Sequence, residues 1–156
     1  MRRRRPVAVC AAGAIAVSMA GPAMANDATL RAKINQLRPT FDADGRAFAM
    51  AISGPATPDT INRTVVAANK LIQDADGARA ALRAIPASSP RVAKGRSLLI
   101  RSLAQLSAGL KKLAAGLMSN QRGMAQQEIK SAGPLLAKSD RNERRAEKLI
   151  GAKISS

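Results

Sequence analysis

Two short acidic segments carry the residue types and spacing nearest to a metal-binding or acid–base site. Asp42-Ala43-Asp44-Gly45 recurs thirty-two residues later as Asp74-Ala75-Asp76-Gly77, and an Asp-x-Asp-Gly unit is a fragment of the calcium-binding EF-hand loop. The outer ligand positions of such a loop need oxygen donors and end in a glutamate. In this sequence they would be Thr40 and Ala51 around the first segment, and Ile72 and Arg83 around the second.

Each pair of aspartates is also badly placed for catalysis, because residues two apart on a helix point away from each other. We therefore interpret the aspartates as exposed side chains. In this interpretation Gly45 and Gly77 are small core glycines that let two helices approach closely. We predict no metal and no cofactor.

Basic side chains on two predicted helices point to the binding of anions. On the helix over 90–118 they lie opposite a leucine stripe, and on the helix over 121–152 they alternate with acids. Glu147 lies three residues after Arg144 and is predicted to pair with it. Two interpretations stay open, a solvated face and an anion-binding strip. The candidate contacts for such a strip are Lys94, Arg101, Lys111, Lys112, Arg141, Arg144, Arg145 and Lys148.

Missing side chains narrow the possible chemistry further. The sequence has no His, Trp or Tyr, one cysteine (Cys10), and two aromatic residues, Phe41 and Phe48, both at predicted core positions. Catalytic triads, thiol nucleophiles and ordinary zinc sites are excluded once Cys10 is removed. Stacking of bases on aromatic side chains is disfavoured. We predict a non-enzymatic protein, with an aspartate-dependent enzyme as the lesser alternative.

Residues 1–25 have the pattern of a cleavable export signal. Four arginines follow Met1, residues 6–19 are uncharged, and Ala23-Met24-Ala25 places small side chains where a signal peptidase needs them. We expect cleavage after Ala25, by either the Sec or the Tat route, and a protein that is secreted or periplasmic, in the cell envelope. A retained membrane anchor is the alternative, weakened by the Gly21-Pro22 interruption.

The remaining chain is strongly cationic. Residues 26–156 contain 22 basic and 10 acidic side chains, a formal net charge of +12. Such a charge attracts anionic surfaces and polymers, for which phospholipid, wall polymer and nucleic acid are the candidates. A membrane-active amphipathic helical protein is the main alternative function. No segment after residue 25 is long and apolar enough to span a bilayer, and the sequence does not indicate an oligomeric state.

Apolar residues recur at helical spacing through most of residues 26–156. The predicted helices span about 27–52, 58–85, 90–118 and 121–152. Thr57-Pro58 and Ser89-Pro90 each supply an N-cap followed by a proline at the first helical position, and Pro39 and Pro134 predict kinks. Short loops favour antiparallel neighbours, so we predict an all-α, single-domain, up-down-up-down four-helix bundle.

The stripes that would form the core differ in regularity. The helix over 90–118 has the most regular stripe, which we assign to the bundle core and not to a coiled coil with a partner. On the first helix, Gly45 occupies a skipped position between Phe41 and Phe48. The last stripe is longer and less regular and ends at Ile154. Three methionines are interpreted as core filler: Met50, Met118 and Met124.

Overall fold

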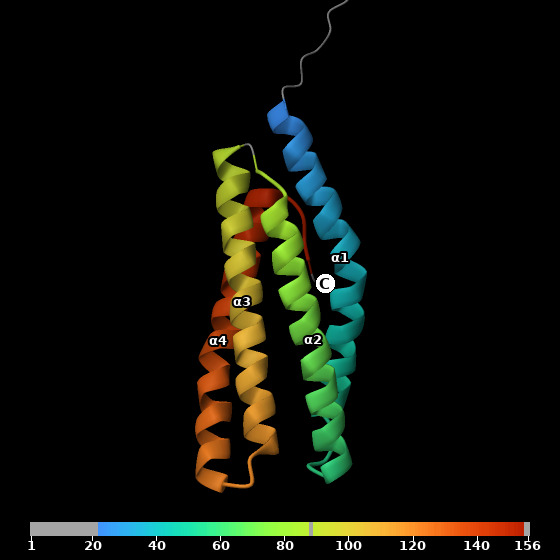
Figure 1. Cartoon of the computed structure of the whole chain (residues 1–156), viewed down its shortest axis with the longest axis vertical. Helices are drawn as coiled ribbons and strands as arrows, with labels where there is room; N and C mark the ends of the chain where they lie inside the picture. The colour runs from blue at the N-terminus through green and yellow to red at the C-terminus, as the bar shows by residue number, and fades with distance from the viewer. Residues whose placement is uncertain (1–21, 88, 155–156) are drawn as a thin grey trace, which may run out of the picture.

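The computed structural model describes residues 22–87 and 89–154, and they form four long helices (Figure 1). The chain runs through α1 (Pro22–Ile52), α2 (Pro58–Ala84), α3 (Pro90–Met118) and α4 (Arg122–Ile150). The α1–α2 and α3–α4 connections lie at the same end of the molecule, the turn end (Figure 1). The start of α1 and the end of α4 lie at the opposite end. The prediction of an all-α four-helix bundle is confirmed.

Local capping signals explain where the helices begin and end. The Thr57 hydroxyl accepts a hydrogen bond from the Thr60 amide at 3.2 Å, and the Ser89 hydroxyl accepts one from the Val92 amide at 3.3 Å. α4 ends at Ile150, and its C-cap Gly151 has a φ of 76°, in the left-handed region that favours glycine. These signals account for boundaries within a few residues of the predicted ones.

The prolines inside α1 and α4 do not break them. Both helices continue through Pro39 and Pro134. The predicted kinks stay predictions.

The start of α1 is tied to the start of α3. Asp27 is buried, and it accepts a hydrogen bond at 2.7 Å from the hydroxyl of Ser89, the N-cap of α3. Residues 1–21, which include most of the predicted export signal and Cys10, lie outside the described residues. Cleavage after Ala25, a position within the first turns of α1, stays a prediction.

The core lies between the helices and is built largely from the predicted stripes. The α3 stripe is confirmed, because most of its leucines are buried and the others partly so. α1 contributes Leu30, Ile34 and Phe41, and α2 contributes alanines, leucines and Ile72 between Ala68 and Leu82. The core also contains Ile154, which lies beyond the end of α4 and is 2% exposed.

α3 and α4 pack together most extensively because small residues face each other along their interface. The positions repeat every seven residues on both helices and run in antiparallel register. Near the middle, the buried Ser102 and Ser139 each donate a hydrogen bond from their hydroxyl to the other's carbonyl oxygen at 2.9 Å. The contacts show this arrangement for Gly95 with Ala146, Ser102 with Ser139 and Gly116 with Ala125; Gly109 lies against Leu135 and Leu136, and Ala132, the matching position of α4, is buried.

Two predictions about the core are wrong. A Cβ atom added at Gly45 or Gly77 would meet no atom within 4 Å, so these glycines do not bring helices together. The glycines in close contact with a neighbouring helix are on α3: a Cβ atom at Gly95 would lie 2.6 Å from Ile150 Cγ1. The three methionines are exposed instead of filling the core, with exposed fractions of 71% for Met50, 66% for Met118 and 56% for Met124.

Candidate anion-binding site

A pocket between α1 and the C-terminal end of α4 brings four basic side chains together. Its volume is about 870 Å³, and we call it the cationic pocket. Four of its lining residues are basic and one, Glu147, is acidic. The lining consists of Asn35 and Arg38 from α1, Arg144, Glu147 and Lys148 from α4, and Gly151, Ala152 and Lys153 from the segment after α4.

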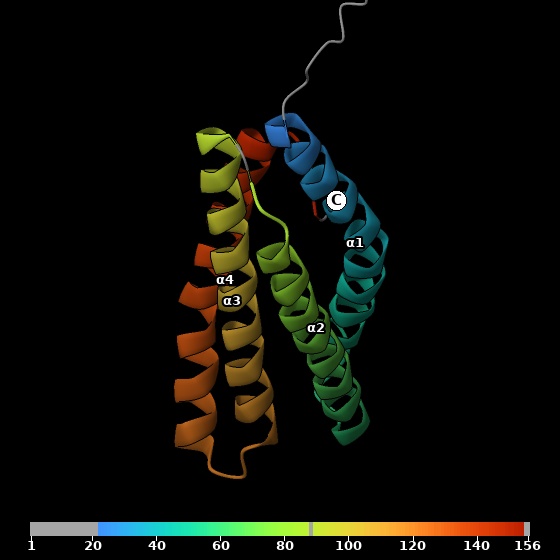
Figure 2. The same cartoon turned by 45° about the horizontal axis from the view of Figure 1, so that its top comes forward.

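The end of α4 and the segment after it shape this pocket. The left-handed Gly151 turns the chain out of the helix, and residues 152–154 then run toward α1 (Figure 2). Arg31 Nε of α1 donates a hydrogen bond to the Ile150 carbonyl at 2.8 Å, and Arg91 Nη2 of α3 donates one to the Lys148 carbonyl at 2.9 Å. The pocket is therefore held by α1, α3 and the buried Ile154.

The four basic residues of the pocket differ in their availability to an anion. Arg38 Nε lies 3.6 Å from the Asp42 carboxylate, and Arg144 Nε lies 2.9 Å from that of Asp140. Within the described residues, Lys148 and Lys153 form no ion pair. The two lysines are thus the cations most open to a ligand. The predicted pairing of Arg144 with Glu147 is wrong, because Asp140, one turn earlier, takes that place.

The structure brings only two of the eight predicted anion contacts into the pocket, Arg144 and Lys148. Lys111 and Lys112 form ion pairs with Asp76 of α2 at 3.5 Å and with Glu128 of α4 at 3.0 Å. Sequence reasoning did not select Arg38 and Lys153 for the pocket. Arg38 is more than a hundred residues from Lys148 in the chain, so no local pattern could have joined them.

The other predicted contacts contribute to a second basic region, which we call the hairpin strip. Each of its residues is exposed and stands one position before a small residue of the α3–α4 interface. In an antiparallel pair of helices, the residues one position before the interface lie on the same side of the pair. The other side of α3 is covered by α2. The strip consists of Lys94 and Arg101 on α3 and Lys138 and Arg145 on α4, with Arg141 exposed on the neighbouring face of α4.

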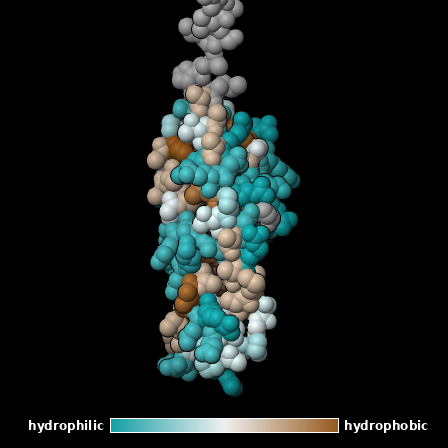
Figure 3. Space-filling view, turned by 90° about the vertical axis from the view of Figure 1, so that its right-hand side faces the viewer, coloured by the Kyte–Doolittle hydropathy of each residue, from teal (hydrophilic) through white to brown (hydrophobic). Residues whose placement is uncertain are grey.

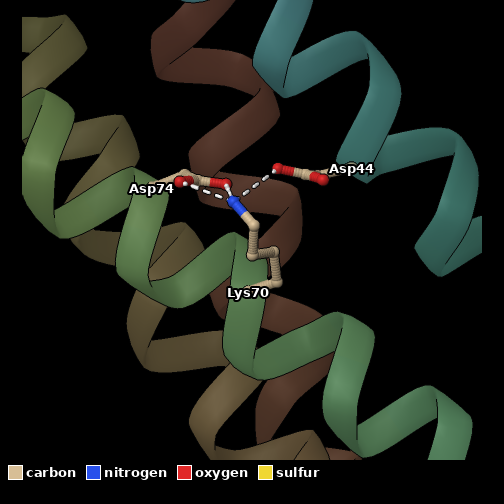
Figure 4. A network of polar contacts seen from close by, with 3 residues as sticks. All are labelled: Asp44, Lys70 and Asp74. Carbon is tan, nitrogen blue, oxygen red and sulfur yellow. Dashed lines mark hydrogen bonds and ion pairs between the residues drawn. The ribbon is translucent and has the colours of Figure 1, made fainter.

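The two acidic segments meet across α1 and α2 (Figure 4). Lys70 Nζ lies 3.4 Å from Asp44 of the first segment and 3.0 Å from Asp74 of the second. The structure thus joins aspartates between the segments and not within one of them. The prediction that these aspartates are exposed is wrong, because Asp44 and Asp74 are partly covered.

Hydrogen bonds displace the pKa values of this cluster in opposite directions. The hydrogen bond with Asp74 raises the pKa of Asp44 above its usual value. Partial burial opposes ionisation of Asp74, but its hydrogen bonds with Asp44 and Lys70 lower its pKa overall. Hydrogen bonds to both carboxylates raise the pKa of Lys70. Within the described residues no three His, Cys, Asp or Glu side chains gather in a metal-binding group.

Asp76 links α2 to α3 and predicts a dependence of stability on acid. Partial burial opposes its ionisation, but the hydrogen bond from Arg79 at 2.8 Å and the charge of Lys111 lower its pKa overall. Its contribution to stability is therefore present above its unfolded pKa and is lost as the pH falls through its lower folded pKa. In circular dichroism melts from pH 6 to pH 2.5, Asp76→Asn should lose less melting temperature than the wild type. Equal losses would contradict this assignment.

The chain was compared with protein-family models, with curated proteins and with solved structures, and nothing matched. In the part of the chain that the structure describes, no helix has the length and apolar character needed to cross a membrane.

Proposed function

We propose that the protein is an exported, non-enzymatic helical bundle that binds an anionic partner in the cell envelope or outside the cell, and that the cationic pocket is its principal contact. The convergence of Arg38, Arg144, Lys148 and Lys153 on one pocket carries this proposal. These cations come from α1, from α4 and from the segment after α4. A charged face that is only solvated does not require such a convergence. The hairpin strip on α3 and α4 extends the basic surface for a long polyanion.

The arrangement of the aspartates supports the non-enzymatic part of this proposal. Asp44, Asp74 and Asp76 are each engaged by a basic side chain of the same or a neighbouring helix. A role in holding α1, α2 and α3 together accounts for these contacts without any catalytic step.

Removal of the two unpaired lysines should separate local binding from general attraction. In low salt, Lys148→Gln with Lys153→Gln should weaken binding of inorganic polyphosphate by about tenfold, because two charge-assisted contacts are lost. The negative slope of log affinity against log salt concentration should become shallower by about 2, because two fewer cations contact the anion. The measurement is isothermal titration calorimetry at graded salt, with vesicles containing phosphatidylglycerol and duplex DNA as further anionic probes.

Arg122→Gln with Lys130→Gln is the matched control, because it removes the same charge from exposed residues near the turn end. It should weaken polyphosphate binding by less than about threefold if the pocket is the contact. An equal loss in both double variants would mean that net charge alone attracts the anion. No binding of any of the three probes in low salt would overturn the proposed function.

Exposed apolar side chains favour a membrane-active protein as the second candidate function. Among the described residues six large apolar side chains are exposed, and each lies in the half of its helix nearest the turn end. Such an apolar end could enter a lipid interface beside cationic contacts. Release of dye from phosphatidylglycerol vesicles, with no effect of the lysine variants, would favour this candidate. The six residues are Met50, Ile52, Val66, Met118, Met124 and Ile129.

A further inference from the structure

An apolar cavity of about 260 Å³ lies between the four helices, next to the cationic pocket. Its lining is apolar except for Glu143, and it includes both phenylalanines of the chain. The floor is buried, as at Leu103 and Ile154, whereas Phe48 and Leu136 are only partly covered. The cavity therefore has an apolar interior and an opening toward solvent. Figure 3 looks onto the α1 side of the molecule, where apolar side chains show between polar ones.

The cavity has an identifiable cause in the sequence. Along the core face of α1, Gly45 occupies the position between Phe41 and Phe48 where another large side chain would complete the stripe. A Cβ atom at Gly45 would meet nothing within 4 Å, and Gly45 lines the cavity. The space is thus the volume of a core side chain that the sequence leaves out. Gly45 makes room inside the bundle and does not bring two helices together.

The apolar cavity and the cationic pocket meet along three elements. On α1, Arg38 lines the pocket and Phe41, about one turn later, lines the cavity. On the antiparallel α4, Glu147 lines the pocket and Glu143, one turn earlier, lines the cavity. In the segment after α4, Lys153 lines the pocket and the next residue, Ile154, lines the cavity. The two therefore lie next to each other, and a ligand with one end in each would cross the boundary that these residues form.

The geometry points to an anionic amphiphile with one acyl or alkyl chain as the ligand, with its head group in the cationic pocket and its chain in the apolar cavity. The assignment rests on the proposed function for the head group and on the cavity for the chain. An apolar cavity of about 150 Å³ holds a benzene ring, so this cavity has room for about ten carbon atoms. Lys148 and Lys153 match a phosphate or carboxylate head.

Chain length tests this assignment in the wild-type protein. Below their micellar concentrations, methyl, butyl, octyl and decyl phosphate should bind with increasing affinity in calorimetry, by up to about fourfold per buried methylene. The increase should level off near ten carbons. Decanoate should also bind more tightly than acetate, which shows that the head group can be either anion, and uncharged decanol should bind more weakly than decyl phosphate.

The two phenylalanines provide a direct readout of where the chain lies. The protein has no Trp, Tyr or His, so Phe41 and Phe48 give all of its aromatic side-chain proton signals, and both line the cavity. Decyl phosphate should shift these signals, and methyl phosphate should shift them little. This measurement does not depend on any variant folding.

Gly45→Leu should fill the cavity and remove the advantage of decyl over methyl phosphate while leaving methyl phosphate binding unchanged. Gly77→Leu is the matched control, because Gly77 is also helical with open space around it and does not line the cavity. It should retain the chain-length dependence. Conversely, Lys148→Gln with Lys153→Gln should weaken both phosphates by a similar factor.

The outcomes distinguish the two proposals. If methyl phosphate and polyphosphate bind but a longer chain adds no affinity and does not shift the phenylalanine signals, the amphiphile assignment is overturned and the anion site stands. If a longer chain adds affinity equally in Gly45→Leu and the wild type, the chain does not occupy this cavity. If no anion binds, both proposals fail.

Discussion

Gly95→Ala should lower the free energy of unfolding by about 1–3 kcal/mol, the usual range for adding a methyl group to a packed interface. The new Cβ atom would lie 2.6 Å from Ile150 Cγ1, 3.0 Å from Leu149 Cβ and 3.3 Å from the Ala146 carbonyl oxygen. Ile150 is buried, and the Leu149 Cβ atom cannot move without its backbone. Relief therefore requires α3 and α4 to separate. Urea unfolding followed by circular dichroism at 222 nm measures the loss.

Gly77→Ala is the control for this substitution, since it adds the same methyl group where nothing lies within 4 Å. It should raise the free energy of unfolding by about 0.5–1 kcal/mol, because alanine is the better helix former. A gain in stability for both variants would show that α3 and α4 do not approach as closely as this at Gly95.

The contrast between these glycines shows how far helical periodicity can predict a fold. The leucine stripe of α3 identifies a face that must be buried, and the caps at Thr57 and Ser89 locate two helix starts; both are local signals. Whether a glycine on such a face touches another helix depends on what lies opposite. On α3, Gly95 faces the end of α4, whereas Gly45 on α1 faces a cavity. The sequence pattern alone does not distinguish these cases.

The exposed methionines have a different explanation. Met50 lies two residues after Phe48 and so points away from the core face of α1, and Met118 lies one residue beyond Leu117, at the edge of the α3 stripe. Periodicity reports which residues share a face and not how far a partner extends. Ile52, four residues after Phe48 on the core face of α1, is accordingly 47% exposed in the last turn before the loop.

The candidate site was predictable only in its chemistry. The cationic excess of residues 26–156 and the basic residues of α4 indicated an anion-binding surface, and two of its residues, Arg144 and Lys148, line the pocket. The other two cations enter through tertiary structure. Arg38 is brought in by the packing of α1 near the end of α4, and Lys153 by a segment that leaves the helix after Gly151.

Ile154→Ala should have the largest effect on stability, a loss of about 2–5 kcal/mol in the free energy of unfolding. Ile154 follows the last helix, yet it is 2% exposed and packs in the core with residues of the other helices. Its truncation would enlarge the apolar cavity. It would also free the segment after α4, which now holds Lys153 in the cationic pocket. Chemical unfolding measures the first effect, and polyphosphate binding should weaken with the second.

Ile52→Ala is the matched control, because it removes the same atoms from an isoleucine that ends α1 and is 47% exposed. It should cost less than about 1 kcal/mol, since little of its side chain is removed from water. A comparable small cost at Ile154 would show that the segment after α4 does not pack into the bundle. The cationic pocket would then lose one wall, because Ile154 is the anchor that holds Lys153 beside α1. Ile154→Ala should therefore lower both stability and anion binding. Lys148→Gln should weaken anion binding without a matching loss of stability, because only the charge of Lys148 is needed.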